Sequence, residues 1–294
     1  MLNIDEIFII YNPVSTGASQ KNAHRLYTQL KKRMPKTTTI ELMKTEYSGH
    51  AEQIAKSVGT KGKKTLIVSS SGDGGYNEVI NGALKNPNKT VVTGLIPSGN
   101  ANDHHRGLTN GQFVEDVVAG RTMKIELLKV NTKINGRQWQ RYAHSYVGIG
   151  LSPAIGKELT KAKLNIFNEK WLLLKFFFKF THAKIIVNRE VRSYSSLIFS
   201  TVSVMSKVIK LSKNIAPNDG KFQVSAIYHQ NKLRVLSWLL IATTRGLEEH
   251  ATTSRYKLKS IKSLPIQLDG EVFTIDKNTR VTVSGEKNAL VCIV

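Results

Sequence analysis

The segment TLIVSSSGDGGYNEVINGAL (65–84) constrains the fold more than any other part of this sequence. An apolar, β-rich run (65–71) leads directly into Ser71-Gly72-Asp73-Gly74-Gly75, and a helical pattern (77–84) follows. Glycine tolerates positive φ and lets a phosphate approach the backbone closely. Free N–H groups of such a turn, together with the N-terminus of the helix, then favour an anion. The segment therefore predicts a phosphate-binding loop between a buried strand and a helix.

Asp73 is an unexpected residue in a loop that binds only an anion, because its carboxylate repels phosphate. Its presence is explained if a divalent cation, or water bound to that cation, lies between the carboxylate and the phosphates. The simpler alternative is a tight turn that needs its glycines, with Asp73 as a helix cap. The residues of this loop alone leave both interpretations open.

Strand-like and helix-like segments alternate through about the first 125 residues. The strand-like runs are 7–11, 38–42, 65–71 and 91–97, and the helical patterns are 22–34, 49–58 and 77–84. This order predicts a parallel sheet covered by helices, that is, a Rossmann-like α/β domain.

Two more polar, glycine-bearing loops, Asn12–Gly17 and Pro97–Asp103, follow the first and fourth strands. In a parallel sheet all three loops lie at the carboxyl ends of strands, where open α/β folds bind ligands. A nucleotide site explains three such loops better than three unrelated turns do. Ser15 and Thr16 also suit a helix cap, which is compatible with a phosphate contact. The side chains of the adjacent pair His104-His105 point apart on a helix or a strand and cannot easily share one ion, so we expect no zinc there.

The pattern changes near residue 125. Asn135-Gly136 between two strand-like runs predicts a hairpin. Residues 157–181 have a helical pattern, and strand-like runs dominate beyond residue 183, with one helix at about 231–248. We therefore expect an α/β nucleotide-binding domain (1–125), joined by a returning terminal strand (288–294), and a β-rich sandwich domain (126–287).

The chain carries 43 Lys and Arg against 21 Asp and Glu, a net charge of +22. This charge predicts attraction to nucleic acid, an anionic membrane or phosphate-rich ligands without choosing among them. A general solubility trait is the alternative. Residues 1–125 carry a net +6 and residues 126–294 a net +16, so we expect the second domain to provide most of the attraction.

Other sequence features bear on the location of the protein. The single cysteine, Cys292, excludes an intrachain disulfide scaffold. The acidic residues Asp5 and Glu6 precede the first apolar run, whereas a signal peptide has basic residues at that place. The longest apolar patch, 171–180, is interrupted by two lysines, and it is shorter than the roughly 20 residues of a membrane span. We expect a cytoplasmic protein, with peripheral binding to the inner face of the membrane left open.

The segment 157–184 combines seven lysines and two glutamates with an aromatic stripe. Phe167, Trp171, Leu174 and Phe178 fall on one face of the expected helix. One interpretation is a helix that faces the core and has a solvated lysine side. The other is a basic, aromatic surface that rests on an anionic bilayer.

Taken together, these segments resemble the diacylglycerol kinase catalytic domain family, bacterial soluble lipid kinases related to sphingosine kinases. Its Asn-Pro-x-Ser-Gly-like, Gly-Gly-Asp-Gly-Thr and Gly-Thr-x-Asn-Asp segments are similar to NPVSTG (12–17), SGDGGYNEVINGA (71–83) and PSGNANDHHRGL (97–108). Further similar segments are TEYSGHAEQIA (45–55), GIGLSPAIGKEL (148–159), NIAPNDGKFQV (214–224) and PIQLDGE (265–271).

The resemblance implies roles for individual residues. The residues that would hold ATP are Asn12, Pro13, Val14, Ser15, Thr16, Thr45, Ser71, Gly72, Asp73, Gly74, Gly75, Tyr76, Asn77 and Asn100. Asp73 and Asp103 would lie near the catalytic magnesium or its waters. Glu271 would be the general base that takes the proton from the lipid hydroxyl. Asp219, with backbone carbonyls of Ala216 and Lys221, would form a structural metal site. Without the resemblance, Asp269-Gly270-Glu271 also fits a plain hairpin turn.

The chain departs from the family pattern at several positions. Ser71 replaces the first glycine, Gly75 replaces the threonine, and Asn100 replaces another threonine. His104-His105 replaces an apolar pair of the family, and Ser152-Pro153 replaces an Asp-Ala-like pair. A lost hydroxyl weakens a phosphate contact by about 0.5–1.5 kcal/mol. The departures therefore put catalytic rate and nucleotide choice in doubt more than the fold.

The sequence thus predicts an ATP- and magnesium-dependent lipid kinase with nucleotide bound in the cleft between its domains. It would transfer the γ-phosphoryl group to a lipid hydroxyl, with diacylglycerol as the leading acceptor, phosphatidic acid as the product and a place in phospholipid biosynthesis. Phosphatidylglycerol, a sphingoid base and other lipid alcohols remain open. We expect a lipid substrate at an anionic membrane surface, no nucleic acid and no transmembrane segment, and we leave a homodimer open.

Two alternatives remain. One is an NAD kinase, which shares the Gly-Asp-Gly loop, although PSGNANDHHRGL (97–108) favours the lipid branch. The other is a non-catalytic basic module that binds nucleic acid. This alternative does not explain the three glycine-bearing loops.

Overall fold

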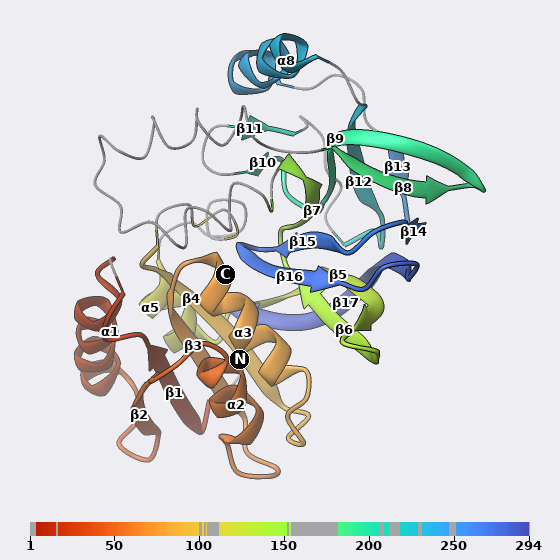
Figure 1. Cartoon of the computed structure of the whole chain (residues 1–294). Coiled ribbons are helices and arrows are strands. Elements are labelled where there is room, and N and C mark those ends of the chain that lie inside the picture. Colours follow the sequence, from red (N-terminus) through yellow and green to blue (C-terminus); the bar gives the residue numbers. More distant parts are fainter. Residues whose placement is uncertain are drawn as a thin grey trace. The chain divides into compact units, whose positions relative to one another are not determined.

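The computed structural model describes residues 4–15, 17–99, 102, 104, 112–151, 153, 182–205, 209–211, 218–228, 231–246 and 251–293 (Figure 1). The chain forms two compact units. The first contains Met1–Glu126 and Lys287–Val294, and the second contains Leu127–Glu286. The expected helix at 157–181 lies outside the described residues.

The first unit contains a parallel sheet. Its strands are β1 (Glu6–Tyr11), β2 (Thr39–Lys44), β3 (Thr65–Ser71) and β4 (Val91–Pro97), in the spatial order β4-β3-β1-β2. Ile9 at the centre of β1 pairs with Leu42 of β2 and with Val68 of β3. The end of β17 (Arg280–Ile293) adds a further parallel strand, because Cys292 pairs with Thr93 of β4. The parallel sheet that the sequence predicted is confirmed.

Helices cover this sheet. They are α1 (Ser19–Arg33), α2 (His50–Ser57), α3 (Asp73–Ala83) and α5 (Phe113–Ala119). Leu26 and Leu30 of α1 pack with Ile7 and Ile9 of β1 and with Phe113 of α5, and each such side chain contributes about 1.5–3 kcal/mol when it is fully buried. Figure 1 shows α2 beside α3, where a Cβ on Gly82 would lie 2.3 Å from the Glu52 carbonyl oxygen.

Two helices begin earlier than expected. α1 begins at Ser19 instead of residue 22, and α3 begins at Asp73 instead of residue 77. Gly72 is extended, and the Tyr76 N–H already donates to the Gly72 carbonyl at 3.1 Å. Because Gly74 and Gly75 are poor helix formers, the sequence favoured a loop here, and tertiary packing overrides that propensity. Asp73 is therefore in the first turn of a helix.

The second unit is built from antiparallel strands, the first of which begins within the first unit at Thr122. They are β5 (Thr122–Ile134), β6 (Arg137–Ala143), β7 (Tyr146–Gly150), β8 (Ala183–Val187), β9 (Glu190–Ser200), β10 (Val204–Met205), β11 (Ile209–Lys210), β12 (Phe222–Tyr228), β13 (Ala251–Thr253), β14 (Arg255–Ser260), β15 (Leu264–Leu268) and β16 (Glu271–Ile275). The main path runs β16-β15-β7-β9-β8-β14-β17, and β12 pairs with β9. β5 and β6 form the predicted hairpin, with positive φ at Asn135 and Gly136.

The core of the second unit lies among these strands. Phe199 of β9 contacts Phe222 of β12, and both are buried with Ile266 of β15 and Val283 of β17. The predicted helix at 231–248 is observed as α8 (Lys232–Thr244). Within the described ranges, no helix is both long enough and apolar enough to cross a membrane.

Candidate functional site

The loop after β1 is bound to the end of β3 by two buried serines. The Ser19 hydroxyl donates to the Ser70 carbonyl, and the Ser70 hydroxyl donates to the Ser19 carbonyl at 2.8 Å. The Asn12 N–H donates to the Ser19 hydroxyl oxygen at 3.0 Å. Neither serine is exposed. These contacts fix the start of the first loop and the N-terminus of α1 against β3.

The loop after β4 joins the same cluster. The Ser98 N–H donates to the Ser71 carbonyl at 2.9 Å, and the Ser98 and Ser70 hydroxyl oxygens are 3.2 Å apart. The Asn22 side-chain amide of α1 donates to the Ser98 hydroxyl oxygen at 2.9 Å. A chain of small polar groups therefore connects all three loops at one edge of the sheet.

Glycines allow the three loops to touch. A Cβ on Gly17 would lie 1.9 Å from the Ser98 carbonyl oxygen, and a Cβ on Gly99 would lie 2.4 Å from the Gly72 Cα atom. Real Cβ atoms do not come this close to backbone, so any side chain at these positions would force the loops apart. The first, second and third loops thus lie in backbone contact with one another.

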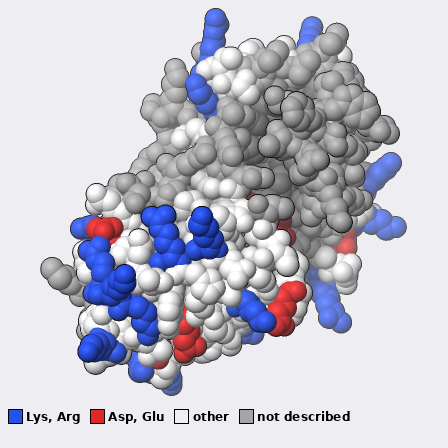
Figure 2. Space-filling view, turned by 90° about the vertical axis from the view of Figure 1, so that its left-hand side faces the viewer, with Lys and Arg blue, Asp and Glu red and all other residues white. Residues whose placement is uncertain are grey.

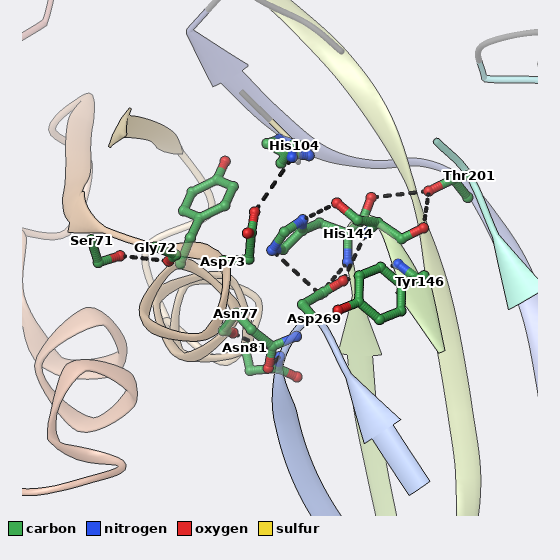
Figure 3. Close-up of polar contacts among 12 residues, drawn as sticks. Ser71, Gly72, Asp73, Asn77, Asn81, His104, His144, Tyr146, Thr201 and Asp269 are labelled. Atoms are coloured by element: carbon green, nitrogen blue, oxygen red, sulfur yellow. Dashed lines mark hydrogen bonds and ion pairs between the residues drawn. The ribbon is translucent and has the colours of Figure 1, made fainter. Parts of the chain in front are cut away.

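Asp73 begins α3 at this junction (Figure 3). Its Oδ1 atom accepts a hydrogen bond from the His104 N–H at 3.4 Å. The N-cap residue is Gly72, and no side-chain cap is formed at this helix end by the described residues. The helix N-terminus carries a partial positive charge that suits both the Asp73 carboxylate and an incoming anion.

Tyr76 and Asn77, two of the predicted nucleotide contacts, have buried side chains. The Tyr76 ring is 1% exposed, its hydroxyl oxygen is 3.1 Å from that of Thr93, and burial raises the pKa of the phenol. The Asn77 side chain is fully buried and its Oδ1 accepts from the Asn81 amide at 3.2 Å. Because α3 begins at Asp73, both residues lie a turn inside the helix, where their side chains belong to the interior.

A pocket of about 470 Å³ opens beside the first loop. It is lined by Asn12, Pro13, Ser15, Gly17, Ala18, Gln20, Lys21 and His24. The Asn12 Oδ1 atom accepts from the Val14 N–H at 3.0 Å, so the asparagine shapes the loop while the Val14 side chain remains 86% exposed. Lys21 supplies a cation to this pocket.

Thr45 follows β2 at the same edge of the sheet. Its N–H and its hydroxyl both donate to the Tyr11 carbonyl, at 2.9 and 3.3 Å. The predicted residues Thr16, Asn100 and Asp103 lie outside the described residues.

The predicted residues of the second unit have separate environments. Glu271 is the first residue of β16, is half-buried and pairs with Leu268 of β15. The Asp219 Oδ1 atom accepts from the Lys221 N–H at 2.8 Å, which is a local turn, and Ala216 lies outside the described residues. Among the described residues of both units, no group of three or more His, Cys, Asp or Glu side chains could hold a metal ion.

Sequence reasoning missed the polar residues that hold the loops together. Ser19, Asn22, Ser70 and Ser98 make these contacts, and they were not among the predicted site residues. The run Ser69-Ser70-Ser71 at the end of a buried strand was the available signal, because a buried hydroxyl needs a partner.

The comparisons with known proteins agree with this architecture. Residues 6–130 match the family described as diacylglycerol kinase catalytic domain. A diacylglycerol kinase of Staphylococcus carnosus (strain TM300) is 24% identical over 289 residues, which cover 90% of this chain and 87% of that protein. A diacylglycerol kinase of Staphylococcus saprophyticus is 26% identical over 277 residues, which cover 88% of this chain and 83% of the relative. Other relatives are named only as lipid kinases.

A solved structure shares the fold of the chain. The crystal structure of a diacylglycerol kinase from Bacillus anthracis str. Sterne matches with a TM-score of 0.70 at 17% identity, and the match covers 100% of this chain and 98% of that one. The family match over residues 6–130 agrees with the resemblance that the motifs indicated. The relatives described above are all named as kinases.

Proposed function

We propose that this protein is an ATP-dependent lipid kinase. The observation that carries the proposal is the backbone contact among the loops after β1, β3 and β4, which Gly17, Gly72 and Gly99 make possible. Three glycine-bearing loops at the carboxyl edge of a parallel sheet suit a nucleotide phosphate chain.

The first unit would hold the donor nucleotide. The backbone of the first two loops would bind the phosphates, and Lys21 would add a positive charge beside the first loop. Asp73 suits magnesium, because this ion is usually bound by one or two carboxylates plus substrate phosphates and water. Magnesium would neutralise phosphate charge when bound.

The acceptor would be a lipid hydroxyl, with diacylglycerol favoured because the relatives carry that name. Glu271 would accept the hydroxyl proton as general base while the oxygen attacks the γ-phosphorus. Other relatives are named as lipid kinases without a stated acceptor, so further lipid alcohols remain candidate acceptors.

The positive surface charge of the first unit favours binding to an anionic membrane. α1 carries five exposed basic residues and no acidic one: Lys21, Arg25, Lys31, Lys32 and Arg33. Figure 2 shows Lys and Arg side chains gathered on the face of the molecule that includes this unit. Basic residues near an anionic surface each contribute about 1 kcal/mol of attraction.

Two variants separate nucleotide binding from turnover. Asp73→Ala should remove detectable binding of magnesium-ATP in a calorimetric titration. Glu271→Gln should retain that binding and lose at least about 100-fold in kcat with diacylglycerol in mixed vesicles, as expected when a general base is removed. Unchanged ATP affinity in the first variant, or a near-normal rate in the second, would show that the proposed role is wrong.

A further inference from the structure

Asp269, two residues before Glu271, is a fully buried carboxylate that receives three backbone hydrogen bonds (Figure 3). Its Oδ1 atom accepts from the N–H groups of Ser145 at 2.9 Å and Tyr146 at 3.0 Å, and its Oδ2 atom accepts from the His144 N–H at 2.7 Å. Its own N–H donates to the Tyr146 carbonyl at 3.2 Å. Such charge-assisted hydrogen bonds are strong, so the turn is firmly attached to residues 144–146.

The segment that receives Asp269 is itself fixed from another side. The hydroxyl of Thr201, just after β9, donates to the His144 carbonyl at 3.0 Å, and the Thr201 N–H donates to the Ser145 carbonyl at 3.0 Å. The buried His144 ring places Nε2 3.4 Å from the Asp269 Oδ2 atom and Nδ1 2.7 Å from the Ser145 hydroxyl oxygen. Residues 144–146 are thus hydrogen-bonded both to Asp269, just after β15, and to Thr201, just after β9.

The backbone of the turn suits the two residues that form it. Asp269 and Gly270 have φ values of +47° and +100°, and the flanking residues Leu268 and Glu271 pair across the turn. Asp-Gly is a favoured pair for a two-residue hairpin turn, because aspartate tolerates the left-handed region and glycine adopts it freely. The Asp269 carboxylate adds the contacts with residues 144–146, and Leu268 is also paired with Val147 of β7.

We propose that Asp269 is the positioning residue of the reaction, because its clamp on residues 144–146 fixes where the β15–β16 turn presents Glu271. This inference rests on the proposed role of Glu271 as general base. A general base must lie within hydrogen-bond reach of the proton that it abstracts, and a displacement of about 1 Å can cost about 100-fold in rate. The clamp therefore acts on turnover, because Glu271 is proposed to act on the acceptor hydroxyl and not on the nucleotide.

The second unit contains a matched control. Asp276 binds the β5–β6 turn through similar contacts in a more exposed position: its two carboxylate oxygens accept from the N–H groups of Asn135 at 3.0 Å and Gly136 at 2.8 Å. Its own N–H donates to the Lys133 carbonyl at 3.2 Å. In both places an asparagine would have to direct its NH₂ group at a backbone N–H donor. Asp276→Asn therefore reproduces the chemical defect at a turn that does not carry Glu271.

The experiment compares Asp269→Asn and Asp276→Asn in the full chain, with Thr201→Val as a milder variant that weakens the same segment from its other side. For Asp269→Asn we expect kcat to fall about 10- to 100-fold while the KM for ATP is unchanged. Thr201→Val should show a smaller fall in kcat. Asp276→Asn should lower the melting temperature and leave kcat unchanged. Hydrogen exchange measured on residues 144–146 should become faster in Asp269→Asn, which reports on the clamp without any turnover.

The outcomes distinguish this inference from the proposed function. A normal kcat in Asp269→Asn, or an equal loss of kcat in Asp276→Asn, would overturn the positioning role. Unchanged hydrogen exchange at residues 144–146 would also overturn it, whatever the activity. If Glu271→Gln is fully active instead, the role of Glu271 as base fails and the positioning role fails with it. An inactive Glu271→Gln beside a normal Asp269→Asn leaves the proposed function standing and removes only the inference.

Discussion

Ser71 occupies the space that a side chain at Gly75 would need. A Cβ on Gly75 would lie 2.7 Å from both the Cβ and the Oγ of Ser71. These are the positions where the related family has its first glycine and its threonine, so the two departures from the family pattern are in direct contact. The hydroxyl lost at residue 75 is matched by one gained at residue 71, next to the same helix N-terminus.

This contact predicts a strong interaction between two substitutions. Gly75→Thr alone should lower the free energy of unfolding by about 1–3 kcal/mol, because rotation of Ser71 cannot move its Cβ away. The double variant Ser71→Gly with Gly75→Thr should recover most of that loss. Chemical denaturation of the four members of the cycle measures the coupling, and additive effects would show that the two positions are independent.

Glu6 predicts an acid dependence of stability in the first unit. Its buried carboxylate accepts from the Thr60 N–H at 2.8 Å, the Thr60 hydroxyl at 2.7 Å and the Lys63 ammonium at 3.1 Å. Burial by itself raises the pKa of Glu6, but these hydrogen bonds and the lysine charge outweigh it, and the pKa lies below the ordinary value of 4.5. The folded state therefore binds this proton less tightly than the unfolded state does.

The sign of the dependence follows from that difference. The stabilisation by Glu6 is fully present above the unfolded pKa and is lost as the pH falls through the lowered folded pKa. The stability advantage of the wild type over Glu6→Gln should shrink as denaturation curves are taken from about pH 7 to about pH 3. The exposed Glu41→Gln on neighbouring β2 is the control. An advantage of Glu6 that stays constant over this range would contradict the assignment.

The basic face of α1 predicts binding to anionic vesicles. Lys31→Glu with Lys32→Glu should weaken vesicle binding by more than about 2 kcal/mol, because two attractions of about 1 kcal/mol each are lost and two repulsions are added. Lys61→Glu with Lys89→Glu makes the same change of charge at exposed lysines outside α1 and is expected to have a smaller effect. Cosedimentation with phosphatidylglycerol vesicles measures both, and equal losses would mean that only net charge matters.

The sequence predicted those parts of the fold that local patterns determine. β3 was expected at 65–71 and is observed at Thr65–Ser71, because a continuous apolar run flanked by turn residues defines a buried strand. The Asn135-Gly136 hairpin was expected for a similar reason, since both residues accept positive φ.

The remaining features depend on tertiary contacts. The early start of α3 contradicts the low helix propensity of Gly74 and Gly75, and it moves Tyr76 and Asn77 into the interior. Asp269 looked like an ordinary turn residue because its partners at 144–146 are more than a hundred positions away in the chain. A contact between residues so far apart in the chain cannot be predicted from local periodicity or motif spacing.

Phosphoryl transfer from ATP to lipid is the claim on which the account depends most. The most direct measurement incubates the protein with γ-labelled ATP, magnesium and mixed vesicles that contain diacylglycerol, phosphatidylglycerol or a sphingoid base, with NAD in a parallel reaction. We predict label in a lipid product, most strongly in phosphatidic acid, and none when Asp73→Ala replaces the wild type. Label in NAD alone, or no transfer to any lipid, would contradict the account.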